Sequence, residues 1–513
     1  MQNTRQLAFF HLWGEILAND NFNGAPVIRN DMFGRLDIYA SYDDITEDNL
    51  VYELNSALVY HIRNMLQEEF LYWYARGVQP ILNRTKEIRD DILNIVQVNT
   101  AAEICDFKNG YLLQKPCSYI ARRNGVQSKV KKLNEYLYRS GKNEADNKTA
   151  DWFHRTGKGV TFVEPNDDAD VPFKAYALDP RSAFVVYSLR PGNKPVMGVN
   201  FVVRDGKAAF DVFTENMVYH LSGTTRGKMI STMPNCDYLV TATQLDSAEP
   251  NVLGRIPIIE YRYNSVNTSA FELAIPLLDE QNNILANAID GVEQFIQSLA
   301  IAVNCEFPEN TTVTDIRKAG MIALRSIGEN KADFKVLSEQ LDQSQTKVLL
   351  DNIEEKILRI CAMPNRSNGG STYDTTGAAI LASYGWYQAD CSARNTEDLF
   401  RESNRQFDRI VVEILRRKGL LDINLNDFEL NFPHDEVVNI QAKAQACGTM
   451  IGFGLSPELA LKKSGVSSDP GLDYGLSKEW FMARWGNPND KNADEQPKPV
   501  QETMENVTVD RVD

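Results

Sequence analysis

The sequence of 513 residues lacks the features that mark membrane-spanning and secreted proteins. It has no run of about 18 or more apolar residues, and its start, MQNTRQLAFFHLWGEILAND, holds a short, broken apolar patch without a small-residue cleavage site. Its seven cysteines include no C-x-x-C pair, which favours isolated buried thiols in a reducing compartment over disulfides. We therefore expect no membrane partner and no disulfides, in a protein that is made and used in a cytosol.

Motifs of the common enzyme classes are also missing. The segment HRTGKGV resembles part of a nucleotide-phosphate loop, but Gly159 follows Lys158 where a Ser or Thr is needed to reach Mg²⁺. No G-x-S-x-G occurs, and no histidine falls at metal-ligand spacing with another histidine or a cysteine; the histidines are His11, His61, His154, His220 and His434. We therefore expect no catalytic residues, no metal and no cofactor.

Positive charge is absent from one long stretch of a chain whose net charge is −16. Between Arg262 and Arg317 there is no Lys or Arg, although the interval contains Glu272, Asp279, Glu280, Asp290, Glu293, Glu306, Glu309 and Asp315. The simpler interpretation of such a charge run is a solvated helix face. The alternative is a surface that lets a polyanion pass, because each fixed cation would add a phosphate contact. Asp279, Glu280, Asp290 and Glu293 are the candidates for that surface.

The elements that are present predict an α+β fold that is mainly helical. Helical periodicity covers residues 50–75 and 100–110, whereas short alternating segments between Trp152 and Tyr263 indicate a β-rich module with a hairpin turn at Asp205-Gly206. Near the C-terminus, one short strand in LDINLNDFELNF precedes a small helical module in which Ser456 caps a helix.

Three long helices follow the β-rich module. The first begins with the capping-box spacing Ser269-x-x-Glu272 and carries an apolar stripe at Leu278, Leu285, Ala288, Val292, Phe295 and Leu299. The second is expected over 342–363, and a strand–helix–strand insert separates it from the first. The third is expected to run from Gly377 to Arg417, with Gly419 as its C-terminal cap.

The segment that joins the second and third helices is built mainly from Pro, Asn, Ser, Gly and Thr. By itself it indicates an ordinary connection between two helices. Alternatively, its short and mostly uncharged side chains suit a projecting loop that makes movable contacts with a ligand. The residues concerned are Asn365, Arg366, Ser367, Asn368, Gly369, Gly370, Ser371, Thr372, Tyr373, Thr375 and Thr376.

Taken in order, several segments resemble the Gp6-like portal proteins of tailed bacteriophages, as found in siphophages. They are LYWYARGVQPILNR (71–84), ILNIVQVNTAAEICDFKNGYLLQKPCSY (92–119), YALDPRSAFVVYS (176–188), IPIIEYRYN with SAFELAIPLLDEQN (256–282) and AQACGTMIGFGLSPELALKKSG (444–465). The sequence departs from the family pattern over its first 50 residues. It also has Thr375, Thr376 and Gly377 where Ser-Ser-Gly is usual before the long helix.

The resemblance implies a portal fold with wing, stem, clip and crown. It divides the chain into an N-terminal segment of unclear role (1–50), wing (51–267), stem helix (268–298), clip (299–339), second stem helix (340–363), tunnel loop (364–376), long wing helix and strand (377–435), crown (436–485) and disordered tail (486–513). Within the clip, Arg317, Lys318 and Arg325 are its candidate functional residues.

The resemblance also implies a structural protein rather than an enzyme. Such proteins form a homo-oligomeric ring, typically of twelve subunits, at one capsid vertex of the virion after assembly in the host cytoplasm. Double-stranded DNA passes through the ring without sequence recognition during packaging and ejection. The implied protein partners are the major capsid and scaffolding proteins, the terminase large subunit and a neck or adaptor protein. The alternatives are a DNA-packaging enzyme such as a terminase subunit, or another ring-forming connector.

Overall fold

The structure is a computed structural model that describes residues 34–86, 91–123, 125–226, 239–296, 343–365, 385–433 and 440–467, with shorter stretches between and after them. These residues form a mixed α+β fold. The chain divides into two compact units, one formed by residues 1–114 and 136–421 and the other by residues 115–135 and 422–513.

A six-stranded sheet forms the core of the β-rich module in the first unit. Its order is β1 (Ile38–Ala40), β5 (Ala183–Ser188), β6 (Pro195–Arg204), β7 (Lys207–Phe213), β8 (Met217–Arg226) and β11 (Leu239–Pro250). Only the β1–β5 pair among these is parallel. The turn between β6 and β7 confirms the predicted hairpin, because Asp205 and Gly206 both have positive φ values, 51° and 77°.

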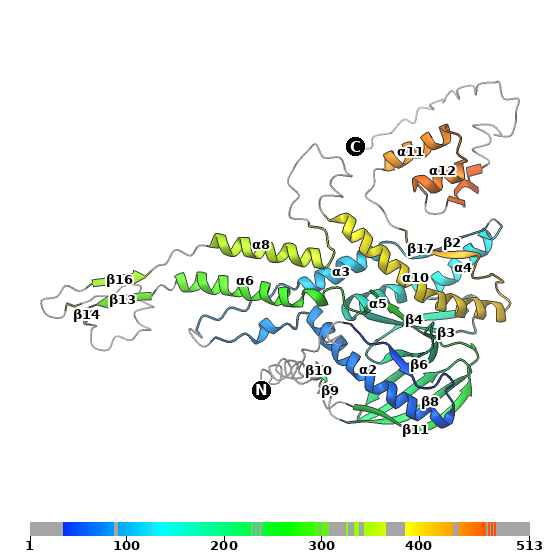
Figure 1. Cartoon of the computed structure of the whole chain (residues 1–513), viewed down its shortest axis with the longest axis horizontal. Helices are drawn as coiled ribbons and strands as arrows, with labels where there is room; N and C mark the ends of the chain where they lie inside the picture. Colours follow the sequence, from blue (N-terminus) through cyan, green and yellow to red (C-terminus); the bar gives the residue numbers. More distant parts are fainter. Residues whose placement is uncertain are drawn as a thin grey trace, which may run out of the picture. The chain divides into compact units, whose positions relative to one another are not determined.

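Helix α2 (Glu47–Ala75) lies against this sheet and buries its apolar face there (Figure 1). Leu50, Leu54 and Leu58 pack with sheet residues such as Phe184 and Phe210 in one core. These leucines recur every four residues along the helix, so they share one face. The predicted helix over 50–75 is therefore confirmed, and its packing partner is the sheet that follows it in sequence.

A second, three-stranded sheet of β12 (Ile258–Arg262), β3 (Lys158–Pro165) and β4 (Phe173–Leu178) packs against two helices, α5 (Lys142–Thr156) and α10 (Trp386–Arg417). Aromatic rings join these layers: Phe400 of α10 lies 4.6 Å from Tyr261 of β12 and 6.4 Å from Phe153 of α5, measured between ring centroids. All three rings are buried. The long helix is thus fixed along this sheet.

Two further long helices, α6 (Ile275–Ile296) and α8 (Gln343–Ile360), lie side by side as a hairpin (Figure 1). At its base, Leu278, Ile353 and Ile357 join a core with Tyr74 of α2 and Cys105 of α3 (Thr100–Leu112). At its far end the chain continues into strands β13 (Leu299–Val303) and β16 (Asp333–Leu337), which pair antiparallel, and into β14 (Cys305–Glu306) and β15 (Arg325–Ser326).

The start of α6 confirms the predicted capping box. Ser269 N donates to Glu272 Oε2 at 2.9 Å, and Glu272 N donates to Ser269 Oγ at 3.1 Å. A short 3-10 turn, η2 (Glu272–Ala274), precedes the α-helix, so Pro276 stands in its first turn as expected.

One predicted helix boundary is wrong, and the predicted apolar stripe is one residue too long. The stripe includes Leu299, but α6 ends at Ile296, and Leu299 begins strand β13. The third helix was expected to run from Gly377, yet Gly385 has φ of 79°, a left-handed conformation that no α-helix contains, so α10 starts at Trp386. Its end is as predicted, because Gly419 is left-handed and its N donates to Arg416 O.

The second unit contains strand β2 (Ser118–Ala121) paired antiparallel with β17 (Phe428–Asn431), together with α11 (Ile440–Gly452) and α12 (Pro457–Ser464). Helix α4 (Gln127–Arg139) runs across the boundary in sequence between the two units. Ser456 Oγ accepts a hydrogen bond from Leu459 N and caps α12, as predicted.

Cys105, Cys361 and Cys447 are buried free thiols, as expected, whereas Cys391 is an exposed one. None of the helices in the described ranges is long and apolar enough to cross a membrane.

Candidate functional site

Asp290, one of the four acidic candidates, is buried inside the subunit. Its carboxylate lies 2.7 Å from Arg84 Nη1 and 2.5 Å from Lys86 Nζ. It also accepts hydrogen bonds of 2.8 and 2.9 Å from the backbone and side-chain nitrogens of Asn94. Burial alone would raise the pKa of Asp290, but the hydrogen bonds from its three partners outweigh burial and lower the pKa below its usual range. Asp290 is therefore ionised, and two cations neutralise its charge.

The partners of Asp290 belong to a segment that we call the strap, residues 78–86 and 91–99, which runs along one polar face of α6. At one end of the strap, Val98 N donates to Asn282 Oδ1 at 2.8 Å, and Asn282 Nδ2 donates to Gln79 Oε1 at 2.8 Å. Further along α6, Arg84 Nη2 donates to Asn287 Oδ1 at 2.5 Å. The strap thus supplies from elsewhere in the chain the cations that α6 itself lacks.

The other three acidic candidates lie in different surroundings. Glu293 Oε2 accepts a 2.7 Å hydrogen bond from Asn94 Nδ2, so it also contacts the strap. Asp279 accepts a 2.8 Å hydrogen bond from Tyr74 OH, and burial raises the pKa of Asp279 although that bond lowers it. Glu280 is exposed. The four carboxylates therefore do not form one uniform acidic surface within the subunit.

Most of the remaining candidates lie outside the described residues. Of the predicted tunnel loop, Asn365 is half-buried after the end of α8. Arg366, Ser367, Asn368, Gly369, Gly370, Ser371, Thr372, Tyr373, Thr375 and Thr376 fall outside the described residues, as do Arg317 and Lys318 of the predicted clip. Arg325 belongs to strand β15, where it pairs with Glu306 of β14 in the strand register.

The α6–α8 hairpin carries apolar side chains that the described part of the subunit covers only partly. Ile289 and Val292 on α6 are 43% and 38% exposed, and Val348 and Leu349 on α8 are 60% and 49% exposed. Exposed apolar residues on two neighbouring helices are typical of a surface that another protein covers. This surface lies on the same hairpin as the strap but is formed by different residues.

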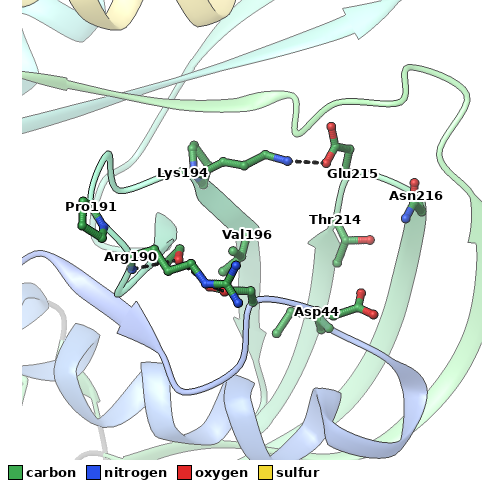
Figure 2. A pocket seen from close by; sticks show the side chains of 12 residues that line it. Asp44, Arg190, Pro191, Lys194, Val196, Thr214, Glu215 and Asn216 are labelled. Carbon is green, nitrogen blue, oxygen red and sulfur yellow. Dashed lines mark hydrogen bonds and ion pairs between the residues drawn. The ribbon is translucent and has the colours of Figure 1, made fainter.

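A hollow of about 400 Å³ lies near one end of the six-stranded sheet, and no sequence motif predicts it (Figure 2). Four of its five charged side chains form two ion pairs: Lys194 Nζ lies 2.7 Å from Glu215 Oε2, and Arg190 Nε lies 2.5 Å from Asp43 Oδ2. Arg190 and Lys194 are largely exposed to solvent. The hollow therefore offers neither a concentration of one charge nor a dry polar site.

The strap was not predicted, because its sequence has no helical or strand periodicity. Its one available signal was the concentration of Asn and Gln on α6, since buried polar side chains need partners.

Comparison with protein families gives one match. Residues 61–475 match the family model described as "Phage portal protein, SPP1 Gp6-like". No curated protein matches the chain significantly. The matched range contains the second half of α2, the strap, the six-stranded sheet apart from β1, the three-stranded sheet, the α6–α8 hairpin, α10 and the helices α11 and α12 of the second unit. Since the match covers most of the chain, the protein belongs to the SPP1 Gp6-like family of phage portal proteins and functions as a phage portal protein.

Proposed function

We propose that α6 and α8 form the stem of a portal ring, that the strands beyond them belong to the clip, and that residues 364–376 form a loop facing DNA in the tunnel. The ring, of twelve subunits as the family resemblance implies, would stand at one vertex of the virion after assembly in the host cytoplasm. Its partners would be the major capsid and scaffolding proteins, the terminase large subunit and a neck or adaptor protein. The protein would act as a conduit for double-stranded DNA without catalysing a reaction.

The observation that carries this proposal is the pair of exposed apolar faces on the α6–α8 hairpin. Val292 on α6 and Val348 on α8 stay exposed in a single subunit. A head-to-tail contact between neighbouring copies would cover an α6 face with an α8 face, and repetition of that contact closes a ring. Net charge opposes this assembly at low salt, because each subunit carries −16.

The carboxylates of the proposed stem would repel DNA less strongly than a uniformly acidic surface would. The Asp290 carboxylate is offset by Arg84 and Lys86, so it adds little to the field outside the subunit. Repulsion of DNA would depend mainly on Glu280, which is exposed, and on Glu293. Helix α6 still has no Lys or Arg of its own to bind phosphate.

The stem assignment is tested by placing a charge on the apolar faces. We expect Val348→Asp to give soluble, folded protein that fails to form rings, because burial of an unpaired carboxylate in the subunit contact is unfavourable. Native mass spectrometry and electron microscopy of the purified protein would measure the rings. Val252→Asp is the matched control, since Val252 is 75% exposed and lies outside the hairpin. Normal rings from both variants would exclude α8 from the subunit contact.

The alternative of a DNA-packaging enzyme such as a terminase subunit predicts ATPase activity in the purified protein. No feature of the chain favours it, because Gly159 follows Lys158 in the one segment that resembles a phosphate loop. Another ring-forming connector would also give rings in the microscope. The family match favours the portal assignment over both alternatives.

A further inference from the structure

The two helices that flank residues 366–384 meet at the point where this segment begins and ends. A Cβ added to Gly385 would lie 3.5 Å from the carbonyl oxygen of Met363 and 3.7 Å from Cα of Pro364. Gln388 Nε2, in the first turn of α10, donates to the carbonyl oxygen of Arg359 in the last turn of α8 at 3.3 Å. The end of α8 and the start of α10 are therefore in direct contact.

A buried lysine on α3 joins these two helix ends. The Nζ atom of Lys108 donates to the carbonyl oxygen of Ala362 and to Ser392 Oγ, both at 3.1 Å. Ala362 is the second residue after α8, and Ser392 lies in the second turn of α10. Lys108 is 6% exposed, and within the part of the chain that the structure describes no carboxylate lies at ion-pair distance from it.

Aromatic packing holds α10 at the same place on α3. The ring of Trp386, the first residue of α10, lies 6.2 Å from the rings of both Phe107 and Tyr111 on α3, measured between centroids. Phe107 and Tyr111 stack on one another at 5.6 Å. Lys108 therefore lies on a part of α3 that also packs against α10, and its two acceptors lie just after the end of α8 and in the second turn of α10.

A buried ammonium group with only neutral acceptors is unfavourable for stability by itself. Burial lowers the pKa of Lys108 to about 8, although the nearby Cys361 thiol acts in the opposite direction. An apolar side chain of similar length would fill the site without this desolvation cost. The backbone at Ala362 adds strain, because Ala362 has φ of 49° in the left-handed turn that ends α8. A buried lysine lowers stability here, and it binds a turn that is itself strained. This combination indicates that Lys108 has a role other than packing.

We propose that Lys108 is a positioning residue that fixes both ends of residues 366–384 to one point on α3. A force on that segment would then pass into the body of the subunit and would not separate α8 from α10. The consequence for DNA rests on the proposed function of the segment, whereas the fixing of its ends can be measured on the protein alone.

Hydrogen exchange of the full-length protein tests the proposal. Lys108→Met should raise amide exchange at least about tenfold at residues 361–365 and 385–389, because hydrogen bonds to a charged group at both ends are lost. Exchange in strands β6 to β8 should not change. Lys108→Arg, which keeps a charged donor, should restore part of the protection. Lys148→Met is the matched control, because Lys148 is exposed and pairs with Glu144 on α5.

Two results would overturn the proposal: unchanged exchange at both helix ends, or an equal rise of exchange throughout the unit, which is what general destabilisation gives. If Lys108→Met does not fold, Ser392→Ala decides the question, because it removes one acceptor and keeps the lysine. Its expected result is a rise of about threefold confined to residues 385–392. Raised exchange together with normal DNA packaging by rings of the variant would support the anchoring and contradict the DNA-facing role of the segment.

Discussion

The buried guanidinium of Arg35 donates a 2.6 Å hydrogen bond to Glu272 Oε1, although the two residues are 237 positions apart in the chain. The same carboxylate caps the turn before α6 through Ser269 N and accepts a 3.3 Å hydrogen bond from Gly34 N. A single acidic side chain thus fixes the start of the α6–α8 hairpin and the segment that leads into the six-stranded sheet.

Glu272→Gln should destabilise the protein by about 3 kcal/mol, because it leaves Arg35 buried without a counter-ion. Urea unfolding at neutral pH would measure the change in the free energy of unfolding. Glu280→Gln, in the following helix α6, removes an exposed carboxylate and should change stability by less than about 0.5 kcal/mol. Equal effects of the two variants would show that the Arg35 contact adds no stability.

Asp290→Asn should make the free energy of unfolding depend less on pH in the acidic range. Because the folded pKa of Asp290 is lowered, its contribution to stability is complete above its ordinary pKa of about 4 and is lost as the pH falls through the lowered value. We expect the variant to be less stable by about 2 kcal/mol at pH 7, with a difference that shrinks below about pH 4. Urea unfolding over that pH range would measure it, and a difference independent of pH would contradict the role given to the two cations.

Glu68 should have the opposite effect on the pH dependence of stability: its carboxyl group should lower the free energy of unfolding as the pH rises. Burial raises the pKa of Glu68 to about 8, and its Oε2 atom has no hydrogen-bond partner among the described residues. Since the folded state holds this proton more tightly than the unfolded state, stability falls as the pH rises from about 4.3 towards 8. Glu68→Gln should therefore match the wild type near pH 4.5 and exceed it by about 2 kcal/mol at pH 8.

Thermal unfolding at the two pH values would measure the effect of Glu68→Gln. Glu103→Gln, which changes an exposed residue on α3, should show no such dependence on pH. If the variant is less stable than the wild type at pH 8, Glu68 is ionised and stabilised by a cation in the folded state.

Ala362→Gly should stabilise the protein by about 0.5–1 kcal/mol, because glycine adopts the left-handed conformation without the contact that strains alanine. The carbonyl oxygen that Lys108 binds is kept. Ala288→Gly, inside α6, should have the opposite effect and cost about 1 kcal/mol. Thermal unfolding of the two variants would compare them, and a loss of stability in both would show that the turn at Ala362 is not strained.

Elements determined by neighbouring residues could be predicted from the sequence. The Ser269–Glu272 capping box, the Asp205-Gly206 turn and the Gly419 cap depend on residues only a few positions apart, and the structure contains all three. The strap could not be predicted, since Val98 and Asn282 are 184 positions apart and each looks unremarkable in its own segment. The start of α10 was missed because one glycine inside a helical pattern is usually tolerated, whereas Gly385 is left-handed.

Because the end of α8 and the start of α10 are in direct contact, the length of the segment that connects them does not determine how the two helices are placed. A connecting segment whose two ends lie next to each other can gain or lose residues without a change in the distance that it has to span. The entropy of closing such a loop rises slowly with length, by about 0.6 kcal/mol for each doubling. Insertions and deletions between residues 365 and 385 would therefore alter the reach of the segment while leaving α8 and α10 in place. This position suits the insertion of a reporter peptide, and relatives of this chain can differ there in length with little change in the rest of the subunit.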